Sequence, residues 1–249
     1  MSFDATYTAL VSFRIRSFAD ACLAIAEDPT ADKLSFLEKI SLAVEAEVTT
    51  RHDRRVARCN KEARFLDPVA CIEDITYLPN RTLSRDTIVR LATGDYIDAG
   101  HNIVVTSTTG CGKSYLICAL GNAACRQGRS VRYIRHADLC RRLDIARRTE
   151  EHYEVIQEMQ ETTLLILDDL FLEEASMITT TDLFEIIAYR EAARLPIIIA
   201  SQLSYEQWHL RIDTKVIADA LLDRVVHNSY TINIEGPNMR EYFAAKKAL

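Results

Sequence analysis

The spacing of apolar residues divides the 249-residue chain into two parts. Over residues 3–26 and 35–64, apolar side chains recur every three or four positions, which is the period of an amphipathic helix. A proline separates the two stretches, and Asp32 and Ser35 are both suitable to cap the second one. We therefore predict a small all-helical N-terminal domain over residues 1–66.

From about residue 99 onward, short β-branched and aliphatic runs alternate with helical patterns. The runs cover residues 102–106, 131–134, 164–167, 197–200 and 230–234. Such alternation predicts an α/β fold with a parallel sheet that helices cover on both faces. Prolines and turn residues over 67–98 indicate a linker with an entry helix over 84–92. Residues 99–249 then form the larger domain, whose tail offers no clear helical lid.

Composition restricts where such a protein works. Hydrophobic residues make up 48% of the chain, which is enough for a core, but no apolar run reaches the length of a membrane span. The N-terminus lacks the layout of a signal peptide. The seven cysteines are odd in number and include no C-x-x-C pair, so we expect neither a disulfide framework nor a zinc ribbon. The net charge of −6 argues against general adhesion to nucleic acid. We expect a soluble cytoplasmic protein without membrane contact.

The segment STTGCGKS, residues 107–114, is typical of a phosphate-binding loop. Such a loop needs glycines at its tight turns, a lysine that reaches the outer phosphates and a hydroxyl for Mg²⁺. It lies between a predicted strand and a predicted helix, whose N-terminus favours anions. The usual first glycine is Ser107 here, so we expect a modified loop that still binds. The expected nucleotide-binding residues are Thr109, Gly110, Cys111, Gly112, Lys113, Ser114 and Tyr115.

Two carboxylates, Asp168 and Asp169, follow the buried run over 164–167. In an open parallel sheet, ligands bind at the carboxyl ends of the strands. We expect Asp168 and Ser114 to hold Mg²⁺, and Asp169 to orient and deprotonate the attacking water of nucleotide hydrolysis. Taken alone, the acidic pair could instead be a solvated turn after a core strand, with no part in nucleotide hydrolysis.

Two further positions are candidates for a hydrolytic site. Ser201, with Gln202 as the second choice, ends the next predicted strand and could contact the γ-phosphate or the lytic water; a simple turn residue is the alternative. Arg224 lies amid the apolar face of the helical pattern ADALLDRVVHN. An arginine offered by a neighbouring subunit can stabilise charge on a transferred phosphoryl group. A salt bridge of this arginine with Asp219, Asp223 or another acid of its own chain stays open.

Basic residues recur at three- and four-residue steps before the linker, which places most of them on one helix face. They are Arg51, Arg54, Arg55, Arg58, Lys61 and Arg64. Such a face can follow a phosphate backbone, and a solvated face balanced by Asp53 and Glu62 is the alternative. A second basic segment, which nearby glutamates could balance, contains Arg141, Arg142, Arg147 and Arg148. The candidate DNA contacts are Arg51, Arg54, Arg55, Arg58, Lys61, Arg141 and Arg142.

With these motifs, the sequence resembles the IstB family, the AAA+ helper ATPases of insertion-sequence transposition, which are similar to DnaC-type bacterial helicase loaders. The likeness includes the phosphate loop, LLILDD, IIIASQLSYEQWH and IADALLDRVVHN. It extends to the basic stretch RHDRRVARCNKEARF, the entry LATGDYIDAGHNIVV and the tail GPNMREY. The family's loop usually begins with Gly-Pro, and here Ser107-Thr108 replaces that pair.

The resemblance implies an AAA+ ATPase, with ATP and Mg²⁺ as cofactors, that forms ring-like or helical homo-oligomers on duplex DNA and promotes a partner transposase. It also implies the role of each site residue. Lys113 and Ser114 would hold phosphate and Mg²⁺, and Asp168 would bind the metal. Asp169 would position the water, Ser201 would be the sensor, and Arg224 would be the arginine finger.

Three other functions fit part of the sequence. A helicase loader acting in replication would bind a helicase and touch single-stranded DNA, but the stretch from Arg51 to Arg64 has no aromatic residue for base stacking. A P-loop kinase acting on a small metabolite would leave Arg224 and the basic helix without a role. A scaffold protein that binds nucleotide but has nearly lost hydrolysis would account for Ser107 in place of the first loop glycine.

Overall fold

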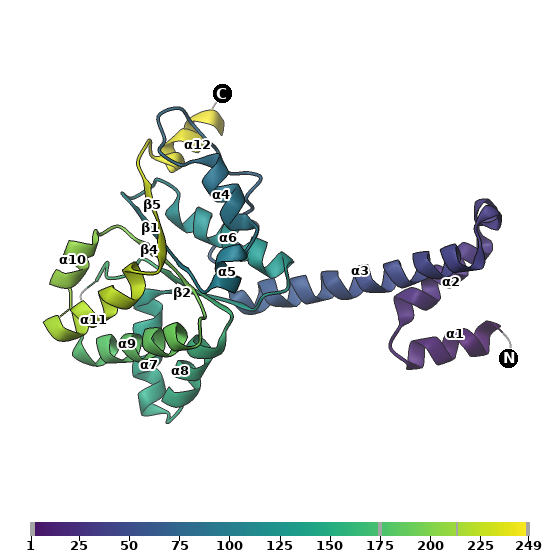
Figure 1. Ribbon diagram of the computed structural model, residues 1–249, viewed down its shortest axis with the longest axis horizontal. Coiled ribbons are helices and arrows are strands. Elements are labelled where there is room, and N and C mark those ends of the chain that lie inside the picture. Colours follow the sequence, from purple (N-terminus) through teal and green to yellow (C-terminus); the bar gives the residue numbers. More distant parts are fainter. Residues whose placement is uncertain (1–2, 174–175, 213, 248–249) are drawn as a thin grey trace. The chain divides into compact units, whose positions relative to one another are not determined.

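The structure is a computed structural model that describes residues 3–173, 176–212 and 214–247. The chain forms two compact units, Met1–Arg58 and Cys59–Leu249. The first unit is helical, and the second contains a sheet with helices on both faces (Figure 1). In the described ranges, no helix is both long enough and apolar enough to cross a membrane.

The first unit contains three α-helices and one short 3₁₀ turn, namely α1 (Phe3–Ser12), α2 (Arg16–Glu27), η1 (Pro29–Lys33) and the first part of α3 (Phe36–Ala63). The stretch 3–26 is therefore two helices, and Arg14 between them adopts a left-handed backbone with φ of 63°. Ser35, one of the two predicted caps, starts α3. Its hydroxyl accepts a hydrogen bond from the Glu38 N–H at 3.3 Å, and the Glu38 carboxylate accepts one from the Ser35 N–H at 2.7 Å. This reciprocal pair is a capping box, which explains why α3 begins where it does.

The second unit is built on one parallel sheet, as the alternating pattern predicted. Its strands are β1 (Asn102–Ser107), β2 (Val131–Arg135), β3 (Leu164–Asp168), β4 (Ile197–Ser201) and β5 (Ser229–Ile234). Their order across the sheet is β2-β3-β4-β1-β5, and every neighbouring pair is parallel. The inner strands β3 and β4 are buried along their whole length, which accounts for their continuous aliphatic runs. All five carboxyl ends consequently lie at one edge of the sheet.

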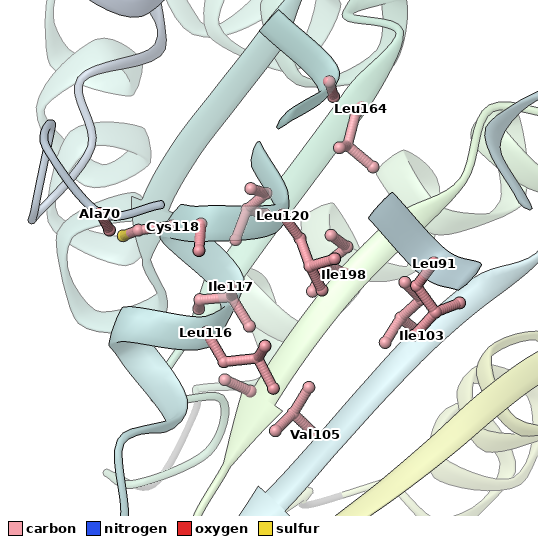
Figure 2. Packing of buried hydrophobic residues seen from close by; sticks show 14 of the residues in the cluster. Ala70, Leu91, Ile103, Val105, Leu116, Ile117, Cys118, Leu120, Leu164 and Ile198 are labelled. Carbon is pink, nitrogen blue, oxygen red and sulfur yellow. The ribbon is translucent and has the colours of Figure 1, made fainter. Parts of the chain in front are cut away.

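Helices cover both faces of this sheet (Figure 1). The helices of this unit are α4 (Arg85–Ala92), α5 (Asp95–Ala99), α6 (Lys113–Arg126), α7 (His136–Arg148), α8 (His152–Glu161), α9 (Met177–Ala192), α10 (Tyr205–Leu210), α11 (Lys215–Val226) and α12 (Met239–Lys247). One core lies between the sheet and α4 to α6, where Ile117 and Leu120 point toward Ile103 and Ile198 (Figure 2). The other lies between the opposite face and α7 to α11. The α/β fold with helices on both faces is therefore confirmed.

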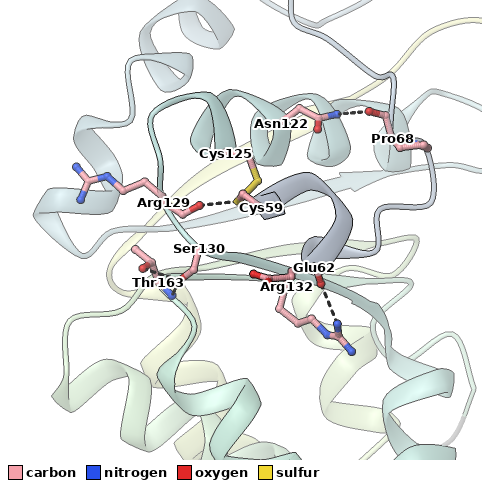
Figure 3. Close-up of a disulfide and its surroundings, with 9 residues drawn as sticks. All are labelled: Cys59, Glu62, Pro68, Asn122, Cys125, Arg129, Ser130, Arg132 and Thr163. Atoms are coloured by element: carbon pink, nitrogen blue, oxygen red, sulfur yellow. Dashed lines mark hydrogen bonds between the residues drawn. A yellow bond between two sulfur atoms is a disulfide. The ribbon is translucent and has the colours of Figure 1, made fainter. Parts of the chain in front are cut away.

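A disulfide between Cys59 and Cys125 corrects the expectation drawn from the cysteine count. The two Cα atoms are 5.6 Å apart, although 66 residues separate them in the sequence (Figure 3). Cys59 belongs to the last turns of α3 and Cys125 to α6, so an odd total with no local pair carried no signal of this contact. Nearby, an Arg132 guanidinium N–H donates to the Glu62 carbonyl at 3.0 Å. The end of α3 is thereby fixed to the helix that follows the phosphate loop.

Candidate nucleotide site

The loop between β1 and α6 has the backbone that a phosphate loop requires. Gly110 and Gly112 have φ of 86° and 88°, in the left-handed region where glycine is favoured. A Cβ at Gly110 would also lie 2.4 Å from Oδ1 of Asn238, which leaves no room for a side chain there. Gly112 directly precedes the first turn of α6, so the unpaired N–H groups of that turn face the loop.

The position of Ser107, where such loops usually have their first glycine, does not require a glycine in this structure. It is the last residue of β1, where it is paired with Ile234 of β5 in ordinary strand geometry. Its hydroxyl donates to the Thr108 carbonyl at 2.9 Å, and its own carbonyl accepts a hydrogen bond from Lys113 Nζ at 3.2 Å. Burial lowers the pKa of Lys113, and the negative charges of Asp169 and Asp168 oppose that shift. The replacement of the first loop glycine therefore leaves the lysine directed at the loop.

A cavity of about 650 Å³ opens over this loop at the carboxyl edge of the sheet. Most of the predicted nucleotide-binding residues line it, namely Thr109, Gly110, Gly112, Lys113, Ser114 and Tyr115. Cys111 does not line the cavity, because its side chain is buried. Its carbonyl accepts a hydrogen bond from Arg81 at 2.7 Å. The cavity is large enough for a nucleotide.

Sequence reasoning missed the part of the cavity that lies away from the phosphate loop. Ile75 and Leu83, from the segment that was predicted as a linker, line it together with Met239 and Phe243 of α12. These apolar side chains suit the ring of a nucleotide base. Arg240 of α12 also lines the cavity. The tail is held here because the Met239 N–H donates to the Gly110 carbonyl at 2.9 Å. In the sequence, the motif GPNMREY was the available signal that the tail belongs to the site.

The two acids at the end of β3 have different surroundings. Asp168 is fully buried, and its carboxylate accepts hydrogen bonds from the Tyr133 hydroxyl at 2.8 Å and from the Asp169 N–H at 2.9 Å. Burial raises the pKa of Asp168, while hydrogen bonds from Ser114 and Tyr133 lower it. Asp169 has φ of 53° and lines the cavity. One carboxylate is thus held in the protein and the other faces the nucleotide space.

The oxygen donors here fit Mg²⁺. Ser114 opens α6 next to Lys113, and its hydroxyl helps to lower the pKa of the Asp168 carboxyl. Hydroxyl and carboxylate oxygens are the protein ligands that Mg²⁺ prefers, and this ion commonly uses one or two of them together with substrate phosphates.

At the end of β4, the neighbouring residues Ser201 and Gln202 lie in different surroundings. Ser201 is fully buried, and its hydroxyl donates to the Leu170 carbonyl and accepts from Trp208 Nε1, each at 2.8 Å. The Leu203 N–H also donates to it, at 3.1 Å. Gln202 instead lines the cavity, where its Oε1 accepts a hydrogen bond from the Thr109 hydroxyl at 2.6 Å. The structure therefore brings Gln202, the second choice, to the nucleotide site and leaves Ser201 in the core.

Arg224 lies outside the cavity of its own chain. It borders a second cavity, at the amino edge of the sheet, together with Asn102 and Asn228. Its Nε is 3.1 Å from a carboxylate oxygen of Glu191, and its guanidinium carbon is 4.9 Å from the ring centre of Phe184. The paired acid is thus on α9, and the guanidinium also donates to the Ala220 carbonyl of its own helix at 2.8 Å. About 30% of the arginine side chain stays exposed.

The predicted DNA contacts fall into two groups. Arg51 is ion-paired with Glu47, Arg58 also has a partner, and Arg141 and Arg142 are ion-paired with acids of their own chain, Asp138 and Glu158. Within the described ranges, three of the predicted DNA contacts on α3 are exposed and have side chains that form neither an ion pair nor a hydrogen bond. They are Arg54, Arg55 and Lys61.

Comparison with known proteins decides the family. Residues 8–247 match the model of the IstB-like ATP-binding proteins of IS21-type insertion sequences. The chain belongs to this family. Together with the loop, acids and sheet order described above, membership assigns this IstB-like protein to the AAA+ ATPases.

Relatives of this IstB-like chain come from several bacteria. An insertion-sequence ATP-binding protein of Sinorhizobium fredii is 36% identical over 235 residues, which cover 94% of this chain and 95% of the relative. One of Pseudomonas fluorescens is 38% identical over 175 residues, which cover 70% and 75%.

Solved structures share the fold at lower identity. DnaA of Aquifex aeolicus bound to AMPPCP gives a TM-score of 0.60 at 19% identity, over 74% of this chain and 55% of that one. DnaI gives 0.59 at 22% identity, over 67% and 92%. The DnaC helicase loader gives 0.57 at 17% identity, over 67% and 97%.

Proposed function

We propose that this IstB-like protein hydrolyses ATP as the helper of an insertion sequence, and that with ATP it assembles on duplex DNA and recruits or activates a partner transposase. The observation that carries the proposal is the meeting of Lys113, Asp169 and Gln202 in one cavity at the carboxyl edge of the sheet. The names of the relatives, insertion-sequence ATP-binding proteins, favour transposition over helicase loading.

The hydrolytic chemistry follows from the position of each side chain. Lys113 and the N–H groups at the start of α6 bind the phosphates, and the apolar side chains at the other end of the cavity hold the base. Asp169 orients the attacking water and accepts its proton, and Gln202 holds the water or the γ-phosphate in line. Asp168 and Ser114 would hold Mg²⁺, which would supply positive charge for the phosphates.

Arg224 completes the site of a neighbouring copy. Its place at the amino edge of the sheet, away from its own nucleotide cavity, suits contact with a second molecule. Its partly exposed ion pair with Glu191 keeps the guanidinium oriented until a neighbour's phosphate replaces the acid. An arginine finger supplied in this way contributes on the order of 10³-fold or more to hydrolysis.

Mixed assemblies test this arrangement. The variants Asp169→Asn and Arg224→Ala should each lose hydrolysis but bind ATP. A 1:1 mixture should regain turnover, because roughly a quarter of its interfaces pair an intact acid with an intact arginine from the neighbour. A mixture as inactive as its components would contradict an inter-subunit role.

The exposed arginines of α3 provide the DNA contact. Arg54 and Arg55 have no competing acid among the described residues, so they are available to phosphates of a duplex despite the negative net charge. Lys61 adds to this surface, whereas Arg51, Arg141 and Arg142 each already face a carboxylate of their own chain, namely Glu47, Asp138 and Glu158.

The test of the proposed function is the ATP turnover rate with and without duplex DNA. We expect DNA to stimulate turnover and ATP to promote assembly on the duplex. Turnover that is insensitive to DNA, combined with no DNA-dependent assembly, would overturn the proposal.

A further inference from the structure

Tyr133 on β2 is a buried residue to which the family motifs give no role. About 5% of the side chain is exposed, and its hydroxyl donates to Oδ2 of Asp168 at 2.8 Å. The other carboxylate oxygen accepts from the Asp169 N–H. The two bonds act on different oxygens of one carboxylate, so together they fix the rotation of its plane as well as its position.

The tyrosine ring is itself held from behind. Its centroid is 6.5 Å from that of Phe65, with the planes tilted by 57°. Phe65 follows the end of α3 and lies so close to α6 that a Cβ at Gly121 would be 2.5 Å from its ring. The ring that carries the donor is therefore held by Phe65 within the buried core between the sheet and α6.

We propose that Tyr133 is a positioning residue that orients the Asp168 carboxylate for the Mg²⁺ of bound ATP. The inference rests on the proposed nucleotide site and adds a residue to it. Partners of a metal ligand that fix its orientation typically contribute 10- to 100-fold to metal affinity. Tyr133 does not line the nucleotide cavity, so its effect should appear in the Mg²⁺ dependence of binding rather than in nucleotide contacts.

Tyr133→Phe removes only the hydroxyl, and Tyr96→Phe is its matched control. Tyr96 is 4% exposed on α5, and its hydroxyl is buried without a hydrogen-bond partner among the described residues. The measurement is the binding of a fluorescent ATP analogue as Mg²⁺ is titrated, with a metal-free titration beside it. We expect the half-saturating Mg²⁺ concentration to rise about 10-fold or more in Tyr133→Phe, and to stay at the wild-type value in Tyr96→Phe.

The metal-free titration distinguishes positioning from general damage. Affinity for the analogue without Mg²⁺ should be the same in all three proteins. If Tyr133→Phe weakens metal-free binding as much as Mg²⁺-dependent binding, the tyrosine is a structural residue and the inference is wrong. An unchanged Mg²⁺ requirement would also overturn it. If the wild-type protein itself binds no nucleotide, the proposed function fails first.

A second pair of variants keeps the test informative should Tyr133→Phe fold poorly. Thermal unfolding is compared for Tyr133→Phe in the wild-type background and in Asp168→Asn, where the acceptor is no longer a carboxylate. The loss of melting temperature should be smaller in the second background, because the two side chains interact directly. Equal losses would show that the hydroxyl does not act through Asp168.

Discussion

The carboxyl edge of the sheet and the exposed face of α3 hold polar residues in opposite ways. At the sheet edge, Lys113, Asp168 and Gln202 each have a named partner that fixes the side chain. On α3, Arg54 and Arg55 are exposed without a partner among the described residues. The first arrangement suits a ligand of one shape, and the second suits a uniform line of charge. Substitutions should therefore have large, specific effects at the sheet edge and small, additive ones on α3.

The largest expected effect is on hydrolysis in Asp169→Asn. The amide keeps the size of the side chain but cannot accept the proton of the attacking water, so turnover should fall by roughly 10²- to 10⁴-fold. ATP affinity should change little, because Lys113 and the loop are intact. Steady-state turnover and binding of a labelled nucleotide check the two parts separately. Turnover near the wild-type rate would show that Asp169 is not the base.

Two neighbouring residues, Ser201 at the end of β4 and Gln202 just after it, allow a comparison within the sheet edge itself. Gln202→Ala should lower turnover on the order of 10- to 100-fold with little change in melting temperature, because this side chain lines the cavity. The same two measurements on Ser201→Ala test the core residue next to it. A large loss of turnover in a fully stable Ser201→Ala protein would restore Ser201 as the sensor.

Ser201→Ala should act on stability instead. The substitution leaves Trp208 Nε1 and the Leu170 carbonyl without their partner in the core, which costs about 1–3 kcal/mol of unfolding free energy. Nucleotide binding should persist at temperatures where the variant is folded. Chemical denaturation monitored by the fluorescence of Trp208 gives the free energy.

The smallest single effects should come from α3. Arg54→Ala and Arg55→Ala should each weaken duplex binding a few-fold and reduce the slope of log affinity against log salt by about 0.9 per lost phosphate contact. The double variant should show the sum. Arg126→Ala is the control, because a two-pronged ion pair with Glu73 already engages that arginine. Equal losses in control and test variants would remove α3 as the specific DNA contact.

The parts of the fold that depend on local pattern were predictable from the sequence. The strands appeared as aliphatic runs because a parallel sheet buries both faces, and Ser35 marked the start of α3 because capping needs that side chain. The phosphate loop was recognisable because glycine is favoured by the left-handed backbone at positions 110 and 112.

The parts that depend on tertiary contact were not predictable. Cys59 and Cys125 meet only because α3 ends against α6, and the base side of the cavity exists only because the tail bonds to Gly110. The choice between Ser201 and Gln202 depended on which of two adjacent side chains the strand turns inward. In each case the deciding partner is distant in the sequence.

Sedimentation of a labelled duplex tests most directly the central claim, that ATP at the sheet edge controls assembly on DNA. With Mg²⁺ and ATP, the wild-type protein should shift the duplex to a fast-sedimenting species that disappears as ATP is consumed. Asp169→Asn should give the same species without the decay, because it binds ATP but does not hydrolyse it. Identical sedimentation of the duplex with and without ATP would contradict the account.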